Sequence, residues 1–219
     1  MATLSGHMTK LDAVNEILAS IGEDPVNSLS SGLPDAELAE SFLDKENRRI
    51  QLKGWQCNTL NDYELTKNDD SMFVLPDNTL KVDTVNPHGP RKTSTPPPNA
   101  YINAAMRRSS DDTKWIMWDG DNNTETWDNE TTLTVTLVQF LEFANLTPAL
   151  QIYVWTSAAH RFQKSTMGSA ALHNFTKEDV AMAEVDAVNE DLENEDLNII
   201  RDNRHVHHIA FRNNPIAGW

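Results

Sequence analysis

The chain has 219 residues, of which 39% are hydrophobic, and its 33 acidic and 18 basic residues give a formal net charge of -15. This length allows one large or two small domains with a real core, and no apolar run approaches the length of a bilayer-spanning helix. The negative charge disfavours tight binding of nucleic acid. The single cysteine, Cys57, excludes an internal disulfide and suits synthesis in a reducing compartment.

Two amphipathic helices are predicted near the N-terminus. Thr9 is the expected cap of the first, and Gly22 is its expected left-handed stop. Four apolar residues share its inner face: Leu11, Val14, Leu18 and Ile21. The second helix begins at Pro34 and ends at Gly54. Its predicted inner side is also apolar: Leu38, Phe42, Leu43 and Ile50.

The middle of the chain changes to short runs of β-forming residues, which predict a small sheet. The expected strands cover residues 55–60, 80–85, 101–106, 115–118 and 131–138. The last is the clearest, because Leu133, Val135 and Leu137 alternate with threonines. Residues 86–99 contain five prolines, which predicts an exposed, extended loop.

A third helix is predicted from Thr147 and Pro148, which suit its cap and first turn. Its apolar residues form two stripes: Leu150, Val154, Ala158 and Phe162 on one, and Ile152, Trp155 and Ala159 on the other. Such a helix is expected either at the centre of its own bundle or partly covered by a neighbouring subunit.

A fourth helix is predicted to open with a capping box formed by Thr176 and Asp179. Four apolar residues are expected to face inward: Val185, Val188, Leu192 and Ile199. Nine acidic residues are expected to face outward: Glu178, Asp179, Glu184, Asp186, Glu190, Asp191, Glu193, Glu195 and Asp196.

Together these elements predict an α+β protein. Residues 1–54 and 147–200 are expected to form a helical bundle from both ends of the chain. Residues 55–146 are expected to form an inserted, small antiparallel β domain with the proline-rich loop, and residues 201–219 an extended C-terminal arm.

The C-terminal arm is basic and aromatic, whereas the rest of the chain is acidic. Its candidate contact residues are Arg201, Arg204, Phe211, Arg212 and Trp219. Because arginine and tryptophan are favoured anchors at interfaces, these residues and Trp155 form the predicted partner interface. A disordered terminus is the competing interpretation of the arm. For Trp55 and Trp155, packing in the core or between subunits is favoured over a ligand platform.

Two motifs have the composition of metal sites. A calcium-loop register is occupied by oxygen-bearing side chains: Asp119, Asp121, Asn123, Glu125 and Glu130. Thr124 replaces the glycine that such a loop requires, so a polar hairpin turn is favoured. The second motif is a cluster of three histidines, His205, His207 and His208. Imidazole side chains suit a transition metal, although a chance grouping is favoured. We therefore predict no metal and no other cofactor.

Two blocks of sequence carry a resemblance to a known family. The first is Leu11–Gly22 (LDAVNEILASIG) with Pro25 and Val26, followed by Arg48-Arg49-Ile50-Gln51, Gly54-Trp55 and Asn58. The second comprises Pro148, Tyr153, Ala158-Ala159 and Arg161-Phe162. Over nearly its whole length the chain resembles the tail tubular protein A family of podoviruses.

The resemblance implies a structural virion protein with no catalytic residues, assembled in the host cytoplasm and not in a membrane. It implies a ring of twelve copies between the portal protein and the nozzle protein, tail tubular protein B, with tail fibres attached at the junction. Phage DNA would pass through the ring without specific binding. An acidic lumen would repel phosphates, and the fourth helix is one candidate for that wall, although a solvated helix face is the simpler interpretation.

The enzymatic alternative is a tail-associated polysaccharide hydrolase that uses paired carboxylates. With 33 acidic residues, a close pair is informative only where it lines a cleft and one pKa is raised. A small-molecule or peptide-binding module would need an apolar pocket, and no sequence motif indicates one.

Overall fold

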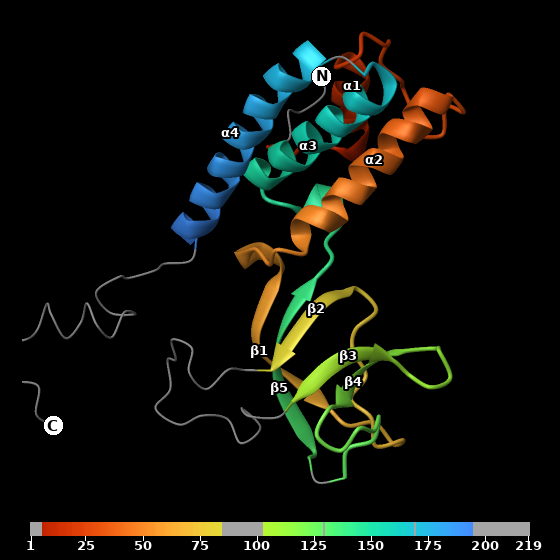
Figure 1. Cartoon of the computed structure of the whole chain (residues 1–219), viewed down its shortest axis with the longest axis vertical. Helices are drawn as coiled ribbons and strands as arrows, with labels where there is room; N and C mark the ends of the chain where they lie inside the picture. The colour runs from red at the N-terminus through yellow and green to blue at the C-terminus, as the bar shows by residue number, and fades with distance from the viewer. Residues whose placement is uncertain (1–5, 85–102, 129, 169, 195–219) are drawn as a thin grey trace, which may run out of the picture.

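The computed structural model describes residues 6–84, 103–128, 130–168 and 170–194. Within these residues, four α-helices gather at one end of the molecule and five strands at the other (Figure 1). The predicted α+β class is confirmed. The domain limits at residues 54, 146 and 200 stay a prediction, and the proline-rich loop lies outside the described residues.

Helix α1, Lys10–Ala19, is capped by Thr9 as predicted. The Thr9 hydroxyl accepts a hydrogen bond from the Asp12 N–H (3.1 Å), and the Asp12 carboxylate accepts one from the Thr9 N–H (3.1 Å). Val14 and Leu18 are buried, whereas the outer members of the predicted face, Leu11 and Ile21, are partly buried. Gly22 has φ +84°, which confirms the left-handed stop.

Helix α2, Pro34–Gln51, ends three residues before the predicted stop, and Gly54 closes the following turn with φ +80°. Leu43 and Ile50 are buried and Phe42 is partly buried. The prediction for Leu38 is wrong, because 39% of this residue is exposed. Ala36 is on the buried side of α2. Leu38 comes two residues later and therefore lies about 200° around the helix, on the side that faces solvent.

The strands form two antiparallel sheets where a single sheet was predicted. Strands β1 (Thr59–Thr66), β5 (Thr132–Gln139) and β2 (Thr79–Thr84) form one sheet with β5 in the middle, and β3 (Ala104–Arg108) pairs with β4 (Trp115–Asp119). The predicted alternation in β5 is confirmed, since Leu133, Val135 and Leu137 are 0% exposed. Their β-domain core is completed by Leu65, Phe73, Leu75, Met117 and Trp127.

The predicted strand over residues 55–60 is wrong in its first half. Residues Gln56–Asn58 form a short 3₁₀ helix, η1, and β1 begins only at Thr59. The strand continues to Thr66 through a largely exposed segment, with an irregularity where Asp62 adopts φ +54°. Pairing with β5, and not a periodic apolar pattern, determines this strand.

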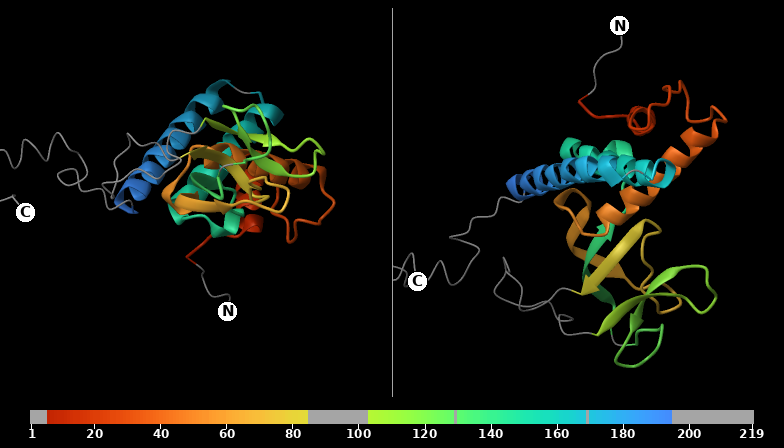
Figure 2. Two further views of the ribbon diagram at one scale, coloured as in Figure 1. Left: turned by 90° about the horizontal axis from the view of Figure 1, so that it is seen from below. Right: turned by 45° about the horizontal axis from the view of Figure 1, so that its top comes forward.

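Helix α3, Pro148–Thr166, contacts α1, α2 and α4, and therefore lies at the centre of the bundle (Figures 1 and 2). Helix α4, Ala170–Asn194, begins six residues before Thr176. The predicted capping box is therefore wrong. Local capping signals do not stop a helix that good helix formers and tertiary packing extend.

Candidate functional site

One arginine from each resemblance block contacts the same buried carboxylate, Glu46. Glu46 of α2 is 0% exposed. Its two oxygens lie 2.6 Å from Arg49 Nη2 and 2.7 Å from Arg161 Nη1, so the carboxylate joins α2 to α3. This cluster is a buried ionic contact between two of the four helices. The sequence gives no sign of it, because Glu46 resembles any surface glutamate of an acidic helix.

Amides from the first block connect the helices to the sheet. The Gln51 side chain donates to the Leu141 carbonyl (2.8 Å) and accepts from the Leu141 N–H (2.8 Å). The Asn58 amide donates to the Gln51 carbonyl (3.1 Å) and the Gln139 carbonyl (3.0 Å), and accepts from the Trp55 N–H (2.7 Å). The motif residues Gln51 and Asn58 therefore have architectural roles at this helix–sheet junction.

Trp55 belongs to the helical core, as its core interpretation predicts. It is 4% exposed, and its indole N–H donates to the Ile50 carbonyl (2.9 Å). Its ring packs edge to face on Tyr153, with centroids 6.3 Å apart.

Three of the acidic residues predicted to face outward instead make contacts within the chain. The Lys53 ammonium donates to Glu184, which lowers the pKa of that carboxyl group below its ordinary value. Glu190 accepts hydrogen bonds from the Thr147 hydroxyl and the Ala149 N–H (both 3.1 Å) at the start of α3. Asp191 accepts from the Gln56 N–H (2.7 Å). A carboxylate stabilises a helix N-terminus electrostatically, so Glu190 supplies the cap predicted for Thr147.

The large apolar residues of α4 face outward, although they were predicted to face the bundle. Ala183 and Ala187 are buried against the bundle, whereas the larger side chains are exposed. We define the exposed stripe by four residues of α4: Met182 (68% exposed), Val185 (57%), Val188 (38%) and Leu192 (50%). The predicted inward orientation of Val185, Val188 and Leu192 is therefore wrong for the single chain, and Ile199 lies outside the described residues.

A groove of about 370 Å³ runs between α3 and α4, beside this stripe. Trp155 is half-buried in it, next to Ile152, Ala159 and Met182. The indole N–H of Trp155 is shielded from solvent and has no acceptor among the described residues. Asp179 and Asp186 also line the groove, and neither forms an ion pair with a described residue.

The calcium-register residues form a turn. Asp119 accepts hydrogen bonds from the backbone N–H groups of Asp121 (2.9 Å) and Asn122 (3.0 Å), and its backbone pairs with Thr124. Burial raises the pKa of the Asp119 carboxyl group, but these hydrogen bonds outweigh it and the pKa is lowered. In the described part of the chain, no three His, Cys, Asp or Glu side chains form a possible metal site.

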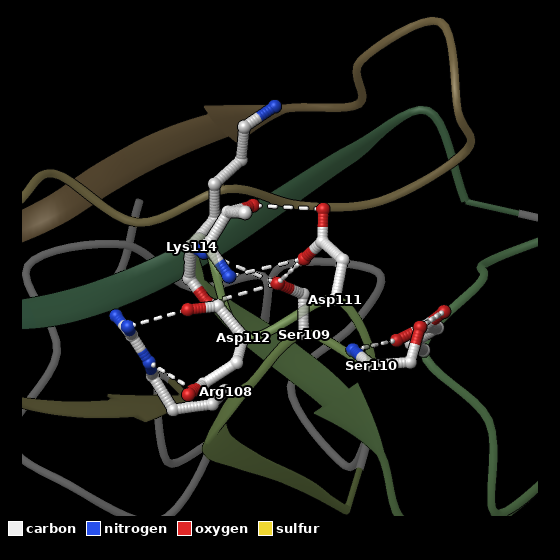
Figure 3. A network of polar contacts seen from close by, with 8 residues as sticks. Arg108, Ser109, Ser110, Asp111, Asp112 and Lys114 are labelled. Carbon is white, nitrogen blue, oxygen red and sulfur yellow. Dashed lines mark hydrogen bonds and ion pairs between the residues drawn. The ribbon is translucent and has the colours of Figure 1, made fainter.

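The neighbouring β3–β4 turn holds a dense polar network (Figure 3). Asp111 accepts hydrogen bonds from the Ser109 hydroxyl and from the Thr113 hydroxyl (2.8 Å) and N–H (3.1 Å). These bonds lower the pKa of Asp111 to about 2. Beside it, Glu125 of the proposed calcium loop accepts from the Ser110 N–H (2.9 Å), so it does not join Asp119. The network stabilises a turn.

The arm residues Arg201, Arg204, Phe211, Arg212 and Trp219 lie outside the described residues, as do His205, His207 and His208. Their role as a partner interface stays a prediction. Of that set, the structure describes Trp155 alone, in the groove between α3 and α4. The described helices include none with the length and apolar composition needed to cross a membrane.

Comparison with known proteins gives one family. No curated protein matches the chain. The family model described as "Tail tubular protein" matches residues 11–197, which covers both sheets and all four helices except Lys10, the first residue of α1. The chain therefore belongs to the tail tubular protein family and is a structural protein of the bacteriophage tail.

Proposed function

We propose that this tail protein forms a ring, of twelve copies, that joins the portal protein to the nozzle protein and forms part of the conduit for DNA ejection. The observation that supports the ring is the exposed apolar stripe of α4. Each of its four side chains is at least 38% exposed in the single chain. Covering them in an assembly would contribute about 1 kcal/mol per residue.

A closed ring needs two different contact faces on each subunit, because a head-to-tail contact is heterologous. Helices α4 and α2 flank α3 on opposite sides (Figure 1). Both present exposed apolar residues, since Leu33 at the start of α2 is 53% exposed and Leu38 is 39% exposed. We propose that the α4 stripe of one subunit contacts the α2 side of the next.

A charge substitution in the stripe tests this contact. Val185→Asp should leave the stability of the single chain nearly unchanged, because Val185 is 57% exposed, and should prevent assembly on the portal. Asn123→Asp adds the same charge at an exposed turn residue and should assemble normally. Light scattering after size-exclusion chromatography measures both. Normal ring formation by Val185→Asp would refute the proposed contact.

The remaining roles follow from position in a tail. The ring would carry tail fibres at its junction with the nozzle, and DNA would pass through without specific binding, because the net charge of -15 per subunit repels phosphates at long range. The exposed acids of α4, including Glu178 and Glu193, would suit a lumen wall, although a solvated helix face is the simpler interpretation. The protein would assemble in the host cytoplasm before it enters the virion.

No observation favours the polysaccharide hydrolase. A surface hollow on α2 is lined by Glu37, Glu40 and Asp44. The Lys10 ammonium bridges Glu40 (2.8 Å) and Asp44 (2.9 Å), whereas a general acid needs surroundings that disfavour its charged form. Three described carboxyl groups have resolved pKa shifts, Asp111, Asp119 and Glu184, and all three pKa values are lowered.

A further inference from the structure

We propose that the groove between α3 and α4 binds the C-terminal arm, residues 201–219, of the same chain. The proposal is independent of the ring, because the groove and the exposed stripe lie on different sides of α4 and share only Met182.

The chemistry of the groove matches the arm. Its floor and wall are apolar, with Ile152 47% exposed and Met182 68% exposed. Its carboxylates, Asp179 and Asp186, have no described cationic partner, and no lysine or arginine lines the groove. An occupant should therefore combine positive charge with apolar side chains.

The arm has this combination. Three arginines, Arg201, Arg204 and Arg212, outnumber its single acid, Asp202. Between and after them lie Ile209, Phe211, Ile216 and Trp219. The planar guanidinium group matches the geometry of a carboxylate, and aromatic side chains suit an apolar groove.

The chain is long enough for its own arm to reach the groove. Asp186 lies about 12 Å back from the end of α4 at Asn194. Residues 195–200 span up to about 20 Å when extended, so the arm can turn back along α4. Tethering also raises the effective concentration of the arm to the millimolar range, which favours it over a segment of another molecule.

Thiol reactivity in the groove tests the proposal in the full-length chain. Cys57 is replaced by serine, and Met182→Cys then places one thiol at the groove. Its alkylation by iodoacetamide is followed by mass spectrometry. Neutralising the arm with Arg201→Gln, Arg204→Gln and Arg212→Gln together should accelerate alkylation about tenfold, the ratio that corresponds to 1.4 kcal/mol of binding. Neutralising the groove with Asp179→Asn and Asp186→Asn should have the same effect.

The matched control is Ala181→Cys, an exposed position outside the groove lining and about 100° around α4 from Met182. Its reactivity should not change when the arm is neutralised. Adding Val185→Asp should leave the protection of the Met182→Cys thiol intact, which separates this proposal from the ring contact. Two results would overturn it. One is equal alkylation rates with native and neutralised arms. The other, measured with Val185→Asp present so that the ring contact is removed, is protection that grows with protein concentration, which would assign the groove to another molecule.

Discussion

At the scale of single residues, substitution of the buried polar groups should destabilise this protein more than substitution of surface residues. Glu46, Gln51 and Asn58 are each at most 2% exposed, and each holds together segments far apart in the sequence. Leaving such a group without its partner costs more than an average surface contact contributes. Three of the resemblance positions, Gln51, Asn58 and Arg161, are therefore explained by architecture.

Removing the buried carboxylate should destabilise the helical bundle. Glu46→Ala leaves Arg49 and Arg161 without their shared partner. Both arginine side chains are about half exposed and can turn toward water, so we expect a loss of about 2 kcal/mol, less than for a fully buried pair. Urea unfolding measures the change. The control is Glu40→Ala, whose side chain is 30% exposed in its pair with Lys10 and should cost less than about 1 kcal/mol.

The β3–β4 turn should lose stability in acid. Because the pKa of Asp111 is lowered from 3.8 to about 2, its ionised form stabilises the fold fully above the unfolded value, and this stabilisation is lost as the pH falls from about 4 to about 2. Asp111→Asn should lower the melting temperature at pH 7, and the difference from the native chain should shrink by pH 3. The control is Asp69→Asn, which removes an exposed carboxylate. If Asp69→Asn lowered the melting temperature as much as Asp111→Asn, with the same dependence on pH, this assignment would be contradicted.

At the scale of secondary-structure elements, two short connections link the bundle to the sheet, and both depend on side-chain amides. Asn58→Ala should cost about 3 kcal/mol, because in a buried site it leaves the Trp55 N–H without its acceptor and removes a donor from the Gln51 and Gln139 carbonyl groups. Asn78→Ala removes one long, exposed contact to the Phe140 carbonyl (3.4 Å) and should cost less than about 1 kcal/mol. Chemical denaturation compares the two, and equal losses would rule out the role of Asn58.

The sequence correctly predicts a fourth helix, but the side of that helix predicted to be buried is wrong. Its small residues Ala183 and Ala187 face the bundle, where they allow close approach to α3. The larger apolar residues remain outside. The proposed ring would cover them, which would account for a helix that is apolar on two sides.

At the scale of the whole molecule, the adaptor proposal makes a direct prediction. The purified protein, mixed with its portal ring, should form a complex of defined stoichiometry, and light scattering of that mixture and of the protein alone measures the masses. A protein that stays a monomer and leaves the portal ring unbound would contradict the adaptor function, although membership of the tail tubular family would stand.

The sequence by itself determined the features that depend on local periodicity and local chemistry. These are the first three helices, the alternation in β5, the left-handed stop at Gly22, the polar turn at Asp119 and the family resemblance. Local patterns suffice there because one apolar face, or one turn, fixes the conformation.

Only the tertiary structure decided the rest. Whether Ala183 or Val185 of α4 faces the bundle depends on the surface that α3 offers, which no pattern within α4 encodes. Strand β1 extends to Thr66 because β5 supplies its hydrogen bonds. Glu46 is buried because Arg49 and Arg161 converge on it from two helices. In each case the deciding interaction joins residues that are distant in the sequence, so its energy appears only once the chain has folded.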